Sequence, residues 1–405
     1  MDYSENRIAD YTGDASFARG GIDVPFLLLT LLLLTIGVVM VLSASFARAY
    51  YSESTNHTAT YFFSRQLIFA VTGVAIMIVA SRFPIGFYRR FAVPVFLFAV
   101  VMLLLVLVGG VKANGARRWF QIGSITFQPS EIAKIAVILV DALLICRFKN
   151  QMGTLKFGVL PFVAVAGIII GLLILEPHLS ASIIIVLITA VMMFAGGTRL
   201  FWFLIGGGAA GLGLLLATSV LHYSSERISA WLDPFADTSD TGYQIVQSLY
   251  AIGSGGLSGL GLGNSRQKYL YLPEEHNDFI FSVVCEELGF IGAVLILILF
   301  ALLICRGFWL AMHCRDRYSF LVCTGVTALL AFQVILNVAV VTNLIPCTGI
   351  SLPFFSYGGT ALWLQLAEMG IVLSISRDIP EKKFFRELGK KKAGKTAGPK
   401  AVSKA

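Results

Sequence analysis

The sequence predicts an all-α integral membrane protein with about ten transmembrane helices and a long extracytoplasmic loop before the eighth helix. Two observations support this fold class. The 405 residues are 57% hydrophobic and only 13% charged, whereas a soluble domain is about one quarter charged. The apolar residues also form runs of roughly 17–25 residues, the length needed to cross about 30 Å of hydrocarbon. This composition excludes a soluble globular protein and gives no indication of a nucleic-acid partner.

The apolar runs define the expected helices in chain order. The fifth and sixth runs are separated only by Glu176, Pro177 and His178, so nine spans is the alternative reading. The first residues carry no removable signal peptide pattern. We expect a cytoplasmic segment at 1–21, a membrane domain at 22–377 with its long loop at 221–278, and a basic cytoplasmic tail at 378–405. The ten expected spans centre on 23–45, 62–81, 91–111, 131–147, 157–175, 179–196, 200–220, 279–305, 318–343 and 357–376.

The distribution of Lys and Arg predicts the orientation. Most of the 31 Lys and Arg residues fall on the side that holds both termini, many of them in the tail from Arg377. Cytoplasmic segments carry the excess of positive charge, so both termini are expected in the cytoplasm. The loop 221–278 is then extracytoplasmic, and Asp278 lies at the outer end of the eighth span.

The stretch LPEEHNDFIFSVVCEELG, residues 272–289, concentrates acidic residues at the start of that span. Asp278 is expected at the membrane surface, where a carboxylate can act as a general base. Glu286, about 12 Å further along a helix, is expected to hold the span in place. The spacing of Glu274, His276 and Asp278 matches no helical zinc motif, although a divalent cation shared with a substrate phosphate stays open.

Other polar groups occur where a membrane protein is otherwise apolar. Glu131 and Lys134 open the fourth span three residues apart, so they can pair on one helix face. Either a structural ion pair or the wall of a charged-substrate cavity explains them. Arg266 and Lys268 are extracytoplasmic cations, which suggests an anionic ligand there. The run GSGGLSGLGLG at 253–263 has no βαβ context for a nucleotide fingerprint, so its glycines are expected to allow close backbone approach.

Several motifs together resemble one known family. They are GARRWFQIGSITFQPSEIAK, LDPFADTSDTGYQIVQSLYAIGSGG, GLGNSRQKYLYLPEEHNDFIFSVVCEELG, the pair Gln333 and Asn337, and PCTGISLPFFSYGGT. The chain resembles the SEDS family (shape, elongation, division and sporulation) of bacterial cell-wall polymerases over most of 22–377. CEELG and FSYGGT look most like its FtsW branch, with the SpoVE branch close behind. Two departures are PHLS, with His178 where the family usually has an acid, and Thr360 in place of a serine.

The resemblance implies an inverting peptidoglycan glycosyltransferase that polymerises lipid II, an undecaprenyl-pyrophosphate disaccharide-peptide, during cell division. It implies Asp278 as the required acid, which we interpret as the general base, and no organic cofactor. Mg²⁺ or Mn²⁺ bound with the substrate pyrophosphate is an expectation. The expected substrate-binding residues are Arg118, Lys134, Glu131, Arg266, Lys268, Glu274, His276, Gln244 and Ser356.

The expected partners are a class B penicillin-binding protein transpeptidase and other division proteins, in the bacterial cytoplasmic membrane at the septum. The alternatives are a lipid II flippase, the same polymerase serving sporulation or elongation, and a scaffold without catalytic activity. A flippase needs polar groups at the membrane midplane. A polymerase needs its base at the outer face, and Asp278 therefore favours the polymerase.

Overall fold

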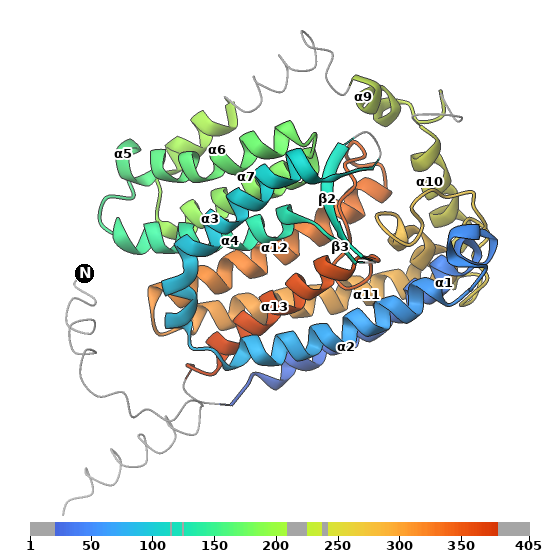
Figure 1. Cartoon of the computed structure of the whole chain (residues 1–405), viewed down its shortest axis with the longest axis horizontal. Coiled ribbons are helices and arrows are strands. Elements are labelled where there is room, and N and C mark those ends of the chain that lie inside the picture. Colours follow the sequence, from blue (N-terminus) through green and yellow to red (C-terminus); the bar gives the residue numbers. More distant parts are fainter. Residues whose placement is uncertain (1–20, 114–115, 124, 209–224, 237–241, 380–405) are drawn as a thin grey trace, which may run out of the picture.

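The computed structural model describes residues 21–379 except 114–115, 124, 209–224 and 237–241. The described part is a bundle of long helices with a small sheet and two short helices at one end (Figure 1). Eight helices are long and apolar enough to span a membrane within the described residues. They are α1 Val24–Tyr51, α2 Tyr61–Arg82, α3 Ile85–Gly109, α5 with α6 as one span Leu155–Leu175, α7 Leu179–Gly196, α11 Ile280–Met312, α12 Arg317–Val341 and α13 Gly359–Ser376.

The helix α4, Pro129–Arg147, is a ninth long helix, and it is buried among the others along most of its length. Glu131, Lys134 and Asp141 lower its hydropathy, but their side chains are buried inside the protein. The predicted seventh span is helical over 200–208, and its remainder lies outside the described residues. The polytopic helical fold is therefore confirmed, and the count of ten agrees with the structure wherever residues are described.

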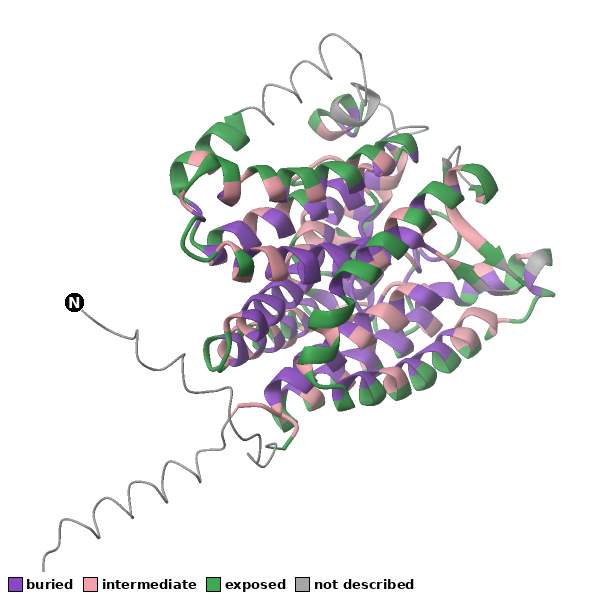
Figure 2. Cartoon of the chain, turned by 60° about the vertical axis from the view of Figure 1, so that its left-hand side comes forward, coloured by how far each residue is buried: buried purple, intermediate pink, exposed green. Residues whose placement is uncertain are grey.

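Packing separates the helices into an inner and an outer set. The inner helices α4, α12 and α13 are mostly buried, whereas less than a third of the apolar stretch of α2 and of α3 is buried. Figure 2 shows the same division, with buried positions gathered in the centre and exposed positions along the rim. A helix that stays apolar on its exposed face faces lipid. The lipid-facing surface therefore lies on the outer helices.

Two polar contacts mark the thickness of the apolar layer. Arg306 Nη2 donates to Asp23 Oδ2 at 2.5 Å at one end of α1, and Ser43 Oγ donates to Glu287 Oε1 at 2.6 Å towards the other. Ser43 follows Asp23 by 20 residues along α1, which corresponds to about 30 Å. This equals the hydrocarbon thickness of a bilayer. We call the end with Asp23 the terminal end and the end with Ser43 the loop end.

A three-stranded antiparallel sheet lies at the loop end, where no pattern in the sequence indicates strands. Its strands are β1 Val111–Ala113, β2 Ala116–Ile122 and β3 Ile125–Phe127, in the order β1-β2-β3. Thr360 Oγ1 at the start of α13 donates to the carbonyl of Thr126 at 2.9 Å. The sheet is thereby fastened to an inner helix, and it carries Arg118 on β2.

The glycine-rich run inserts its backbone into a break in α11. Gly289 has φ +67 inside this helix, which breaks the regular helical hydrogen bonds. The helix α10 spans Tyr243–Gly255, and the residues that follow it form hydrogen bonds with the α11 backbone at this break. The pairs are Leu260 N to Glu286 O, Gly261 N to Glu287 O, Phe290 N to Gly256 O and Ile291 N to Leu257 O, at 2.9–3.1 Å. We call residues 256–271 the clip loop. The predicted close backbone approach is confirmed.

The contact between the clip loop and α11 requires glycine where their two backbones meet. A Cβ at Gly289 would lie 2.2 Å from the nitrogen of Gly259, at a positive φ. We expect Gly289→Ala to lower the free energy of unfolding by about 1–3 kcal/mol through backbone strain. The loss would be larger if the hydrogen bonds between the clip loop and α11 also broke. The measurement is the melting temperature of the purified protein in detergent. Gly253→Ala is the control, because Gly253 lies in α10 with open space around it and alanine favours a helix. Equal melting temperatures for the two variants would contradict this account.

Candidate functional site

Asp278 lies at the loop end, just before α11 begins, where two other segments of the chain hold it. Asn337 of α12 donates its side-chain amide to the carbonyls of Asp278 at 2.8 Å and Ile350 at 2.7 Å. Ser356 Oγ donates to the carbonyl of Asn277 at 2.8 Å. The backbone before α11 is therefore fixed to α12 and to the loop that precedes α13.

The carboxylate of Asp278 faces the turn at Gly349. A Cβ added at Gly349, which has φ +66, would lie 3.1 Å from Asp278 Oδ2. Burial, followed by the charge of the neighbouring Glu274, raises the pKa of Asp278 to about 6 against the opposing effect of Arg118. A carboxylate with a pKa close to the working pH is a suitable general base. The structure thus gives Asp278 both a defined position and suitable basicity.

Arg118 extends from β2 towards the turn between α6 and α7. Its Nε donates to the carbonyl of Glu176 at 3.2 Å, and its Nη2 donates to the carbonyl of Pro177. The guanidinium also lowers the pKa of Asp278 by its charge, so the two groups share one electrostatic environment. Backbone carbonyls therefore hold the Arg118 cation near Asp278. A cation in this position can stabilise an anionic leaving group.

The two titratable groups of this turn are neutral near pH 7. Burial raises the pKa of Glu176 to about 8, against the opposing effect of Arg118. Burial, followed by the charges of Arg118 and Lys134, lowers the pKa of His178 to about 3. Neither side chain offsets the positive charge of Arg118. His178 contributes a neutral imidazole, with its Nε2 3.4 Å from Gln128 Nε2.

Glu131 and Lys134 form the ion pair that their spacing predicts. The distance from Lys134 Nζ to Glu131 Oε2 is 2.7 Å, and both side chains are largely buried at the start of α4. The pair lies near the same turn, because the charge of Lys134 affects His178. It therefore belongs to the polar region around Arg118, although its role in binding substrate stays a prediction.

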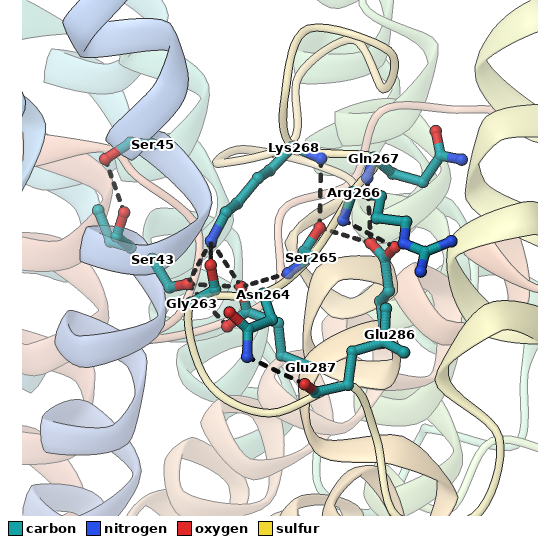
Figure 3. Close-up of polar contacts among 12 residues, drawn as sticks. Ser43, Ser45, Gly263, Asn264, Ser265, Arg266, Gln267, Lys268, Glu286 and Glu287 are labelled. Atoms are coloured by element: carbon teal, nitrogen blue, oxygen red, sulfur yellow. Dashed lines mark hydrogen bonds and ion pairs between the residues drawn. The ribbon is translucent and has the colours of Figure 1, made fainter.

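The structure gives Lys268 a structural role, unlike the substrate contact that the sequence suggests. Its side chain is buried, and Nζ pairs with Glu287 Oε1 at 2.9 Å and donates to the carbonyl of Gly263 at 2.6 Å. Ser43 of α1 accepts a further bond from Lys268 at 3.3 Å. Figure 3 shows these groups converging between α1 and the clip loop. Because Glu287 already neutralises the ammonium group, the contact of Lys268 with substrate stays a prediction.

Glu286 and Arg266 belong to the same network. The Glu286 carboxylate accepts hydrogen bonds from Ser254 Oγ, Ser265 Oγ and the backbone nitrogens of Arg266 and Gln267. Glu286 therefore holds the clip loop on α11, which confirms its expected structural role. The side chain of Arg266 is exposed, and its predicted contact with substrate stays untested.

The remaining predicted residues lie around the segment before Asp278. Glu274 accepts from Asn277 Nδ2 at 2.5 Å. The His276 ring lies against Phe62 and Tyr357, with centroids 4.6 and 5.7 Å away. Ser356 supports this segment through its bond to Asn277. Gln244 on α10 has its Oε1 4.0 Å from Cys347 Sγ in the loop before α13.

An ion pair that no sequence pattern indicates connects α1 to this segment. Arg48 donates to both oxygens of Glu275 at 2.7 and 2.8 Å. Burial by itself would raise the pKa of Glu275, but the neighbouring His276 and the hydrogen bonds from Arg48 outweigh it and lower the pKa. The two partners are 227 residues apart, so no local spacing indicates the pair.

A divalent cation that binds together with a substrate pyrophosphate stays a prediction. Among the described residues, no group of three or more His, Cys, Asp or Glu side chains is arranged to hold a metal ion. Asp278 and Glu274 would be the nearest carboxylates for an ion that takes its other ligands from a pyrophosphate. Mg²⁺ commonly binds through one or two carboxylates and substrate phosphates.

The fold and the site define a polytopic membrane protein whose polar chemistry gathers at one membrane surface. A family model described as "Cell cycle protein", for FtsW, RodA and SpoVE, matches residues 24–380. The chain belongs to this family, which confirms the resemblance seen in its motifs.

Individual relatives agree with the family match. The "Probable peptidoglycan glycosyltransferase FtsW" of Trichlorobacter lovleyi is 40% identical over 358 residues, covering 87% of this chain and 93% of the relative. "Stage V sporulation protein E" of Bacillus subtilis is 40% identical over 360 residues, covering 88% and 97%.

Solved structures have the same fold. The rod shape determining protein RodA of Thermus thermophilus matches with TM-score 0.65 and 28% identity, covering 89% of this chain and 98% of that one. A chain from work described as "Structural coordination of polymerization and crosslinking by a peptidoglycan synthase complex" matches with TM-score 0.72 and 28% identity, covering 88% and 98%.

Proposed function

We propose that this chain is a peptidoglycan glycosyltransferase that polymerises lipid II at the outer face of the cytoplasmic membrane during cell division. The observation that carries the proposal is Asp278, a half-buried carboxylate whose pKa is raised to about 6, fixed at the loop end beside the charge of Arg118. The names of the relatives support the same activity. An amphiphilic substrate requires a site at the membrane surface, which is where Asp278 lies.

In the proposed mechanism, the Asp278 carboxylate takes the proton from the acceptor sugar hydroxyl as its oxygen attacks the anomeric carbon of the donor. The bond from that carbon to the pyrophosphate breaks, the leaving group keeps the electron pair, and attack from the opposite side inverts the centre. Arg118 stabilises the negative charge that develops on the pyrophosphate. Lys134, held by Glu131, forms part of the cavity wall. A divalent cation, when bound with the pyrophosphate, would supply further charge neutralisation.

The family supports a proposal for the partners and the location. One solved neighbour comes from a peptidoglycan synthase complex, which supports a transpeptidase of the class B penicillin-binding type as partner. We propose that both termini are cytoplasmic, in keeping with the basic tail, and that the protein works at the division septum with other division proteins. A sporulation role is the nearest alternative, because a sporulation protein is as similar as the FtsW relatives.

The proposed base predicts a specific pH dependence. Only the deprotonated carboxylate accepts a proton, so kcat/KM should rise with pH, reach half its maximum near the Asp278 pKa of about 6 and level off above it. Glu274→Gln removes a charge that raises this pKa, so its profile should shift to lower pH. Initial rates of lipid II consumption between pH 5 and 8 measure both profiles. A wild-type rate that is flat over this range would contradict the assignment.

A flippase is the second candidate, favoured by ionisable side chains buried within the spans, such as Asp141 of α4 and Glu368 of α13. An assay in proteoliposomes that contain fluorescent lipid II distinguishes the two functions. A polymerase converts accessible lipid II into glycan chains on a denaturing gel. A flippase leaves it monomeric but makes inner-leaflet lipid II accessible to an external reagent. With the transpeptidase and a divalent cation supplied, we expect glycan chains. Translocation of lipid II without chain formation under the same conditions would overturn the proposal.

A further inference from the structure

The clip loop is held at the level where the apolar layer ends. Its backbone bonds to α11 between Glu286 and Ile291, and its Lys268 pairs with Glu287, which also binds Ser43. Ser43 is about 30 Å along α1 from the polar pair at the terminal end. The clip loop therefore lies at the hydrocarbon boundary itself, although its sequence suggests a loop in water.

The clip loop buries two of its polar side chains and exposes most of its large apolar ones. Lys268 and Ser265 point inward and are buried. The large apolar side chains point outward, with the exposed fraction of each close to or above one half. These are Leu257, Leu262, Tyr269, Leu270 and Tyr271. A loop surrounded by water would normally show the opposite division, so this surface requires an apolar cover.

The lipid-facing surface of α11 identifies that cover. Phe290 and Ile291 lie in the membrane-spanning helix and are strongly exposed. The backbone nitrogen of Ile291 donates to the carbonyl of Leu257 at 3.1 Å, so the exposed Leu257 continues the surface that α11 presents to lipid. Tyrosines are enriched where hydrocarbon meets water, and Arg266 is an exposed cation in the same loop.

We propose that the clip loop is an interfacial membrane anchor whose occupant is the bilayer lipid itself. Leu257, Leu262 and the run Tyr269–Tyr271 insert at the boundary of the outer leaflet, and Arg266 lies among the phosphate headgroups. The anchor directly precedes the segment 272–278, so it fixes the height of Asp278 relative to the membrane surface. This last consequence rests on the proposed function, whereas the insertion does not.

Nitroxide labels in lipid nanodiscs test the insertion without any activity assay. Single cysteines would replace Leu262 and Tyr271 in a background in which the six native cysteines are substituted. Ile291→Cys is the lipid-facing control, and Asn56→Cys, exposed in the loop before α2, is the aqueous control. Collisions with oxygen report hydrocarbon, and collisions with a water-soluble nickel chelate report water. We expect both clip-loop positions to favour oxygen over nickel, as at position 291.

If both positions favoured collisions with the nickel chelate over oxygen, as position 56 should, the proposal would be overturned. Loss of both kinds of collision when the transpeptidase is added would also overturn it, because a protein would then cover the surface. A second measurement avoids the cysteine-free background. A photoreactive benzoylphenylalanine at position 262 of the otherwise unchanged chain should cross-link to phospholipid, and cross-links to protein alone would contradict the anchor.

Discussion

Replacing Asp278 by asparagine is expected to lower the rate of glycan polymerisation by about 10²–10⁴-fold, the usual contribution of a general base. The amide keeps the size of the side chain but cannot accept the proton of the attacking hydroxyl. The fold should persist, because Asn337 and Ser356 hold this segment through the backbone carbonyls of Asp278 and Asn277. Initial rates with lipid II, together with the melting temperature, separate the two effects.

Asp23→Asn is the matched control for this experiment. It makes the same chemical change at the terminal end, where Asp23 pairs with Arg306, about 30 Å from the loop end. It should leave kcat close to the wild-type value even if the melting temperature falls. A rate for Asp278→Asn within a few-fold of wild type would remove Asp278 from the mechanism.

Breaking the buried pair between Lys268 and Glu287 is expected to have the largest effect on stability. Both side chains are almost fully buried, so Lys268→Met leaves a carboxylate without its counter-charge, which typically costs about 3–5 kcal/mol. The double variant Lys268→Met with Glu287→Met should lose much less than the sum of the single changes, because no unpaired charge remains. Thermal unfolding in detergent measures all of these variants.

Lys112→Met provides the control, since Lys112 is exposed on β1 and surface changes are usually within about 0.5 kcal/mol. If Lys268→Met melted at the same temperature as this control, the pair would not hold the clip loop. Additive losses in the double variant would instead mean that the two residues act independently.

Local patterns in the sequence predict much of the architecture and part of the site. Apolar runs define the helices because only a long apolar helix satisfies its backbone in lipid. The pair Glu131 and Lys134 follows from helical spacing, and the position of Asp278 follows from the start of an apolar run.

The remaining features depend on contacts that no local pattern contains. Lys268 was expected to face substrate, yet its partner Glu287 comes from a different element that the clip loop reaches only after folding. Arg48 and Glu275 are brought together by the packing of α1. The strands β1 and β3 are only three residues long, too short for alternation to indicate a strand. The break at Gly289 lies inside an apolar run that predicts an unbroken helix.

The most direct test of the account uses the purified protein, its transpeptidase partner, lipid II and a divalent cation. Glycan products from wild type and from Asp278→Asn would be compared on a denaturing gel. The account predicts a ladder of glycan chains from wild type and none from the folded variant. Equal ladders from both proteins, or no ladder from wild type, would contradict the claim that this chain polymerises lipid II with Asp278 as its base.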